Sequence, residues 1–153
     1  MKLNELRNGV CAVIAEKTGS QMVQSCNHAF DLGADLVELR LDFLEEEFSI
    51  AEVLKNISGP SLVTIRRKSD GGLWENEEHS RIKILQQAQY SGAHAIDVEV
   101  DCFHHFPTNG DCLRILSYHN FTQTPDDISL LHKAFDVRGS PFPGRIHPAV
   151  SVT

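Results

Sequence analysis

The chain has 153 residues, of which 41% are hydrophobic and 23% charged, values typical of one globular domain with a sizeable core. Its formal net charge of −7 argues against a nucleic-acid partner or an anionic membrane surface, because both attract cationic proteins. No apolar stretch approaches the roughly 20 residues of a membrane span, and no signal-type segment opens the sequence. We therefore expect a cytoplasmic protein. The net charge does not exclude an anionic small molecule as its ligand, provided that arginines cluster locally.

Strands and helices alternate along the sequence. Apolar runs typical of buried strands span 10–15, 36–41, 61–65, 95–100 and 113–116, and helical patterns separate them or follow the last of them. This alternation predicts an α/β fold with a parallel sheet and right-handed crossovers. Five strands suffice for an open doubly wound sheet, but they are little more than half of a closed eight-stranded barrel of about 250 residues.

Charged residues occur in pairs within two of the predicted strands. Glu38 and Arg40 are two residues apart, so they share one face of the second strand, and Asp97 and Glu99 repeat this spacing on the fourth. A strand covered on both faces does not bury two charges without a use. An internal ion pair between Glu38 and Arg40, and hydrogen bonding of Asp97 and Glu99 within the sheet, are the structural alternatives to a binding site.

Three more polar residues follow the C-terminal ends of strands. Arg66 ends the third strand, Asp70 lies in the Gly-ended loop that follows, and His119 comes just after the fifth strand. C-terminal ends of parallel strands converge on one crevice, so these side chains are candidates for a shared site. His119 is the best candidate for proton transfer, because imidazole titrates near neutral pH. A solvated turn is the alternative for Asp70 and its neighbours.

The four cysteines are scattered and form no Cys-x-x-Cys pair. Cys11 lies in a strand pattern and Cys26 on an apolar helix face, so we expect both thiols to be buried. A zinc site assembled from four residues of one irregular segment would define an open α/β metal-binding module, but the spacing matches no usual ligand pattern. Those four residues are Cys102, His104, His105 and Cys112.

Four segments taken in order resemble the type I 3-dehydroquinate dehydratases, and the resemblance covers about the first 130 residues. The segments are Glu38-Leu39-Arg40-Leu41-Asp42, Thr64-Ile65-Arg66 with Asp70-Gly71-Gly72, Ile96-Asp97-Val98-Glu99, and Ser117-Tyr118-His119-Asn120-Phe121 with Thr124-Pro125. The resemblance implies a partial (β/α)8 barrel and a hydro-lyase of the shikimate pathway that converts 3-dehydroquinate to 3-dehydroshikimate and water. It also implies that no metal or added cofactor is needed.

The resemblance assigns roles to five residues. It makes His119 the proton-transferring histidine, puts Asp70 where the family usually has a glutamate that orients this histidine, and makes Glu38, Arg40 and Arg66 substrate contacts. Aspartate is one methylene shorter than glutamate, so we expect a longer contact to the histidine and a less well ordered site.

The Schiff-base lysine that the family carries on its sixth strand has no match, because a Pro- and Gly-rich segment beginning near Arg138 occupies that place. Lys68 and Lys133 are unsuitable substitutes, and the family's first-strand serine has no clear match either. We expect a partial barrel domain over 1–135 and an irregular tail over 136–153, in a truncated product of doubtful activity. The alternative is an inactive remnant that binds ligand weakly, pairs with another chain, or forms homo-oligomers through its unclosed sheet edge.

Overall fold

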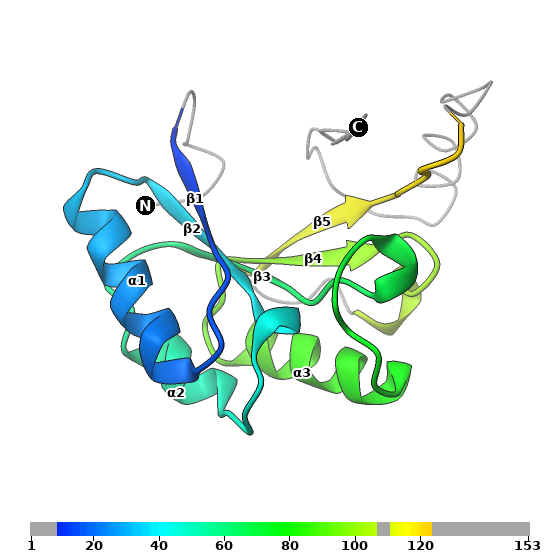
Figure 1. Ribbon diagram of the computed structural model, residues 1–153, viewed down its shortest axis with the longest axis horizontal. Coiled ribbons are helices and arrows are strands. Elements are labelled where there is room, and N and C mark those ends of the chain that lie inside the picture. Colours follow the sequence, from blue (N-terminus) through cyan, green and yellow to red (C-terminus); the bar gives the residue numbers. More distant parts are fainter. Residues whose placement is uncertain (1–8, 107–110, 124–153) are drawn as a thin grey trace.

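The computed structural model describes residues 9–106 and 111–123. The helical pattern that follows the last predicted strand, which the sequence opens with Thr124-Pro125-Asp126-Asp127, and the predicted tail over 136–153 lie outside this part of the chain. The described residues alternate between strands and helices, as expected (Figure 1). The elements are β1 (Cys11–Ile14), α1 (Gly19–Asp31), β2 (Leu36–Arg40), α2 (Ile50–Lys55), β3 (Ser61–Thr64), α3 (Glu78–Tyr90), β4 (Ala95–Glu99) and β5 (Leu113–Ser117). Three short 3₁₀ turns accompany them, at Leu41–Phe43, Lys68–Asp70 and Phe103–His105.

The five strands form one parallel sheet in the order β1-β2-β3-β4-β5. Each strand therefore lies beside the next one in sequence, and α1, α2 and α3 all lie on one face of the sheet (Figure 1). A doubly wound sheet reverses its strand order and carries helices on both faces, whereas a (β/α)8 barrel does neither. The predicted α/β fold is confirmed. The sheet has the strand order of a partial (β/α)8 barrel and not that of an open doubly wound sheet.

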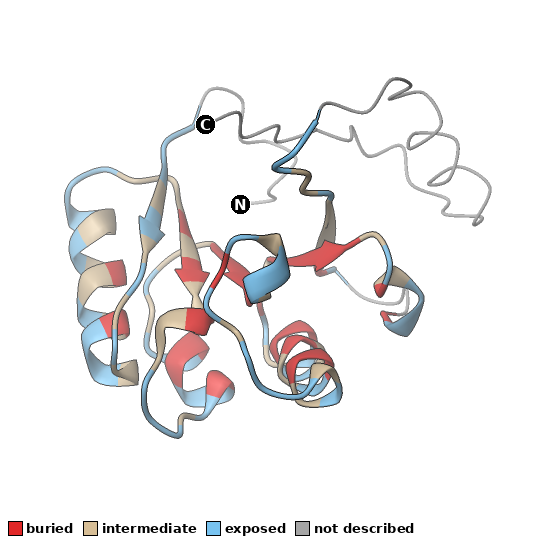
Figure 2. Ribbon diagram, turned by 45° about the vertical axis from the view of Figure 1, so that its right-hand side comes forward, coloured by how far each residue is buried: buried red, intermediate tan, exposed pale blue. Residues whose placement is uncertain are grey.

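The hydrophobic core lies between the sheet and the three helices (Figure 2). Every second residue of β2 faces this layer, because side chains alternate along a strand, and Val37 and Leu39 are completely buried there. Each such aliphatic side chain contributes about 1.5–3 kcal/mol when fully buried. Other fully buried members are Met22, Cys26, Val63, Ile65, Leu85, Ala88, Ile96 and Val98.

Local capping explains where the helices begin and end. The Thr18 hydroxyl accepts a hydrogen bond from the backbone N–H of Gln21 and caps α1. Ser49 caps α2 in the same way, as the Ser49-to-Glu52 capping box predicts. Gly92 follows α3 with a φ of 96°, a left-handed conformation that favours glycine.

The second face of the sheet is open along its first strand. Val13 on β1 remains 58% exposed, and Cys11 is exposed on the same side of the strand. The prediction that Cys11 is buried is wrong, because α1 covers only the other face of β1. Cys26 is buried as predicted, and burial raises the pKa of its thiol to about 11. Among the described residues, no helix has the length and apolar character needed to cross a bilayer.

Candidate active site

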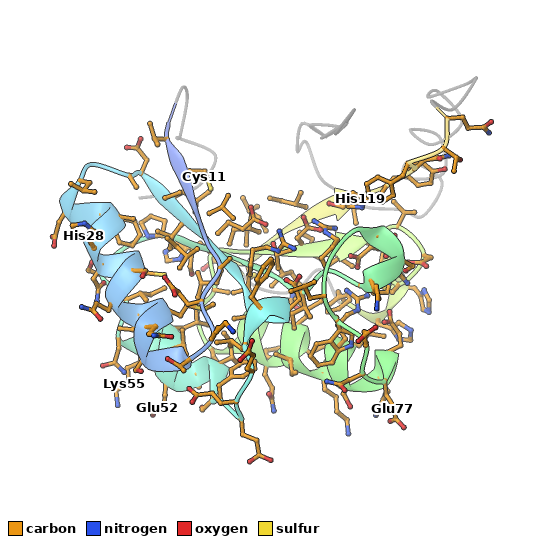
Figure 3. All side chains as sticks on the ribbon, viewed as in Figure 1. Cys11, His28, Glu52, Lys55, Glu77 and His119 are labelled. Atoms are coloured by element: carbon orange, nitrogen blue, oxygen red, sulfur yellow. The ribbon has the colours of Figure 1, made fainter. Side chains whose placement is uncertain are left out.

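The open face of the sheet gathers the polar side chains of β2, β3 and β4, and we call it the inner face. Strand register explains this grouping: Glu38 pairs with Leu62 and Arg40 with Thr64, and residues paired across a parallel sheet point to the same side. Arg66 lies two residues beyond Thr64 and therefore shares that side. Figure 3 shows His119 on the side of the sheet away from the helices.

Arg66 is the centre of a hydrogen-bonded network on this face. Its guanidinium donates to both oxygens of Asp97, at 3.2 and 2.8 Å, and to Oε1 of Glu99 at 3.1 Å. The Ser117 hydroxyl donates to the same Asp97 carboxylate at 2.9 Å, so β3, β4 and β5 are joined. The Arg66 side chain is only 11% exposed, and two carboxylates keep its planar fork in one orientation.

A second arginine reaches this network from the helix layer. Arg81 on α3 is completely buried, and its guanidinium donates to Oε2 of Glu99 at 2.6 Å and to the Ile65 carbonyl at 3.0 Å. It also makes two hydrogen bonds to Glu78, at 2.9 and 2.7 Å. Glu99 therefore lies between two arginines, and Arg81 connects the helix layer to the inner face. The sequence interpretation did not include Arg81, although an arginine four residues before the buried Leu85 was the available signal.

Arg40 pairs with Asp42 and not with Glu38. Its Nε and one terminal nitrogen donate to the two Asp42 oxygens at 3.0 and 2.8 Å, and these hydrogen bonds raise the pKa of Arg40. Asp42 also accepts from the backbone N–H of Leu73 at 3.1 Å, so it anchors the loop after β3. Within the described residues no hydrogen bond or ion pair engages the Glu38 carboxylate, which acts on Arg40 only through its charge.

Asp70 and His119 lie near each other but share no hydrogen bond in the described structure. The Asp70 carboxylate accepts from Nε of Arg67 at 2.5 Å and from the Ser69 hydroxyl at 3.2 Å. The Nδ1 atom of His119 is buried and has no hydrogen-bond partner there. Burial lowers the pKa of His119, and the charge of Arg66 lowers it further, so the imidazole is neutral at pH 7.

The five predicted site residues thus differ in their surroundings. Glu38 and Arg40 share the inner face with Arg66, and the charges of Arg66 and Asp70 both act on His119. The structure adds Asp42 as the partner of Arg40, and Asp97 and Glu99 as the partners of Arg66. Ser117 in turn donates to Asp97, and Arg81 donates to Glu99. The described residues combine two cations held in fixed orientations, one carboxylate with no partner in this part of the chain, and one neutral imidazole. This combination suits a hydroxylated anion that loses a proton.

The described residues give no support to the zinc alternative. No group of three or more His, Cys, Asp or Glu side chains in the described ranges is arranged to hold a metal ion. Cys102 instead contacts Arg81 and the Glu99 carbonyl, and Cys112 contacts the Leu113 carbonyl.

Sequential parallel strands, helices on one face and polar side chains on the other define part of a (β/α)8 barrel. Solved structures agree on the fold. The 3-dehydroquinate dehydratase of Geobacillus kaustophilus matches 92% of this chain and 63% of its own with a TM-score of 0.72 at 22% identity. That of Enterococcus faecalis matches 90% and 67% with a TM-score of 0.69 at 19% identity.

Sequence comparisons identify the family. The model of the family described as type I 3-dehydroquinase matches residues 10–137. The chain is 35% identical over 127 residues to the 3-dehydroquinate dehydratase of Methanothermobacter thermautotrophicus, and the matched region covers 80% of this chain and 57% of that protein. It is 37% identical over 126 residues to the bifunctional 3-dehydroquinate dehydratase/shikimate dehydrogenase of Arabidopsis thaliana, over 76% of this chain and 21% of that protein. The chain belongs to the type I 3-dehydroquinase family, and it spans little more than half of the archaeal relative and about a fifth of the plant protein.

Proposed function

We propose that this chain carries the substrate-binding and proton-transfer half of a 3-dehydroquinate dehydratase site, in a hydro-lyase that converts 3-dehydroquinate to 3-dehydroshikimate and water. The observation that carries the proposal is the gathering of Glu38, Arg40 and Arg66 on one face of the sheet, with His119 beside them. Family membership supports the same reaction class. By this proposal the protein acts in the shikimate pathway in the cytoplasm.

The chemistry of each residue fits a polyhydroxylated carboxylate. Arg40 and Arg66 are fixed by their carboxylate partners and offer their remaining N–H groups to anionic or hydroxyl oxygens. The Glu38 carboxylate, which has no partner among the described residues, accepts a hydrogen bond from a substrate hydroxyl. His119, being neutral, removes the proton next to the ketone, and the resulting imidazolium gives a proton to the departing hydroxyl, so the protons balance.

The Schiff-base step has no assigned residue in the described part of the chain. The four lysines there lie on loops or helices rather than strand ends, and two of them pair with glutamates, Lys17 with Glu45 and Lys68 with Glu75. The proposal is therefore restricted to binding and proton transfer. We also propose that 1–135 acts as one partial barrel domain with 136–153 as a tail, and that β1 and β5, the edge strands of the described sheet, support self-association.

Calorimetric titration of the purified chain with 3-dehydroquinate tests the site. Because Glu38 has no partner in the described structure, Glu38→Gln removes a ligand contact without breaking an internal one. We expect saturable binding that weakens about tenfold in this variant, as for one hydrogen bond to a charged group. Glu52→Gln is the matched control, since Glu52 is exposed on the helix side of the sheet (Figure 3).

Equal binding by the Glu38→Gln and Glu52→Gln variants, or no saturable binding by the unaltered chain, would overturn the proposed site. Reduction with borohydride in the presence of 3-dehydroquinate, followed by mass spectrometry, separately tests the imine. An adduct on one of the described lysines would contradict the restriction to binding and proton transfer.

A further inference from the structure

Arg67 holds three acidic segments together beside the proposed site. Its Nε donates to Asp70 at 2.5 Å, and its terminal nitrogens donate to the two oxygens of Asp101 at 2.9 and 3.3 Å. Glu78 at the start of α3 lies 3.7 Å from the same guanidinium. The Arg67 side chain is 23% exposed, so these contacts are partly shielded from water. The Asp70 carboxylate is therefore turned toward Arg67.

The loop that carries Asp70 also packs against the segment that carries His119. A Cβ atom built on Gly71 would lie 2.7 Å from the Phe121 ring, so the two segments touch. The Phe121 ring in turn stacks on the His119 imidazole, with 6.3 Å between ring centroids and an angle of 19° between the ring planes. Nδ1 of His119 nevertheless remains buried without a partner. A buried nitrogen that lacks a hydrogen bond costs about 1–3 kcal/mol, so a carboxylate free to approach would accept a hydrogen bond from Nδ1 when Nδ1 carries a proton.

We propose that Arg67 is a positioning residue that withdraws the Asp70 carboxylate from His119 and so controls which ring nitrogen of His119 carries the proton. With Arg67 in place, Asp70 is bound on the Asp101 side and the imidazole stays neutral. Without Arg67, Asp70 is free to accept from Nδ1–H, which leaves Nε2 as the basic nitrogen and stabilises the imidazolium. This inference rests on the role of His119 proposed above, and adds a residue that acts on it through Asp70.

The other charges that face His119 do not depend on Arg67. Arg66, from the end of β3, disfavours the imidazolium, and Asp97, from β4, favours it. Arg66 and Asp97 are hydrogen-bonded to each other, so their opposite effects on the pKa of His119 partly cancel. None of the variants below changes either residue, so these effects are the same in all of them. Asp70 favours the imidazolium and Arg67 disfavours it. Loss of Arg67 therefore acts in one direction, through removal of its own charge and release of Asp70.

Long-range ¹H–¹⁵N correlation spectra of the ligand-free, ¹⁵N-labelled chain measure the pKa and the tautomer of His119. The His119→Gln variant assigns its signal among those of the eight histidines. In Arg67→Gln we expect the pKa of His119 to rise by about one unit, a tenfold gain in proton affinity, with the neutral form shifting to the Nδ1–H tautomer. Adding Asp70→Asn to Arg67→Gln should reverse most of this rise, whereas Asp70→Asn alone should change the pKa much less.

Lys68→Gln is the matched control, because it removes a neighbouring cation whose ammonium pairs with Glu75 and not with Asp70. If the Arg67→Gln variant does not fold, the Arg67→Lys variant replaces it in the test. Lysine keeps the positive charge, but it cannot bind Asp70 and Asp101 together as the guanidinium fork does. Its His119 pKa should still rise, by less than in Arg67→Gln. Equal effects of Asp70→Asn with and without Arg67, or a change in Arg67→Gln no larger than in Lys68→Gln, would overturn the inference. None of these measurements needs 3-dehydroquinate, so failure of ligand binding and failure of this inference are separate results.

Discussion

Replacing the buried Arg81 by methionine should destabilise the protein by about 3 kcal/mol. Methionine keeps an unbranched side chain that can fill much of the same space, so the substitution mainly removes the guanidinium. That group is completely buried and donates to Glu99, the Ile65 carbonyl, Cys102 and Glu78. The Glu78 contact is partly exposed, and such a pair on a helix is worth only about 0.3–0.5 kcal/mol.

The larger part of the cost arises in the interior. Loss of Arg81 removes the donor to the Ile65 carbonyl and leaves Oε2 of Glu99 with only the weak donor Cys102 Sγ, at 4.0 Å; a buried group that lacks its hydrogen bond costs about 1–3 kcal/mol. Breaking a buried ion pair typically costs about 3–5 kcal/mol in total. Arg66 still donates to the other Glu99 oxygen at 3.1 Å, so the Glu99 charge is not left alone and the lower end of that range applies.

Urea unfolding followed by circular dichroism measures this difference. For a slope of about 2 kcal/mol per molar urea, a loss of 3 kcal/mol lowers the unfolding midpoint by about 1.5 M. Lys83→Met is the control, because Lys83 is an exposed cation on the same helix and its replacement should change stability by less than about 0.5 kcal/mol. A loss for Arg81→Met no larger than for Lys83→Met would refute the view that Arg81 neutralises Glu99 in the folded state.

Two further outcomes are expected. Gly72→Ala should lower the thermal midpoint by several degrees, because its Cβ would lie 2.2 Å from the Arg66 backbone oxygen. Gly92→Ala should lower it by less, because nothing lies within 4 Å there and only the positive φ of 96° opposes the side chain; equal shifts measured by calorimetry would contradict this. A hydrogen bond from Arg81 lowers the pKa of Glu78 in the folded protein. The ionised Glu78 carboxylate therefore stabilises the fold fully at pH values above its unfolded-state pKa. This stabilisation is lost as the pH falls through the lower, folded-state pKa. Urea unfolding should therefore show a deficit for Glu78→Gln near pH 7 that shrinks below about pH 4, and a constant deficit would exclude the ion pair as its cause.

The strands could be predicted from the sequence because their apolar runs are bounded by glycine, proline and charge. The helix after Ser49 is the main difference in this region. The apolar pattern of Val53, Leu54 and Ile57 in the sequence predicts a helix that reaches Ile57, but α2 ends at Lys55. The side-chain amide of Asn56 donates to the Glu52 carbonyl at 2.7 Å and satisfies a carbonyl at the helix end. This local competition between side chain and backbone is invisible to hydrophobic periodicity.

The side-chain pairing within the site could be predicted only in part. Two-residue spacing correctly indicates that Glu38 and Arg40 lie on one side of β2, but it does not indicate that Arg40 turns to Asp42. The chain leaves the strand at Arg40, where φ is −87° and ψ is 83°, and the 3₁₀ turn that follows brings Asp42 back within reach. Contacts between elements, such as that of Arg81 with Glu99, depend on tertiary packing that no local pattern encodes.

The two arginines of the third strand's end have opposite effects on neighbouring acids. Arg66 turns inward and fixes Asp97 and Glu99 on the inner face, while Arg67 turns outward and draws Asp70 and Asp101 away from it. Successive residues of an extended backbone point to opposite sides, so adjacency in sequence produces this division. On the inner face Arg66 therefore neutralises Asp97 and Glu99, whereas Asp70, whose charge also acts on His119, is held by Arg67. A charge reversal or loss at Arg67 changes the proton affinity of His119 without altering any residue proposed to contact the substrate.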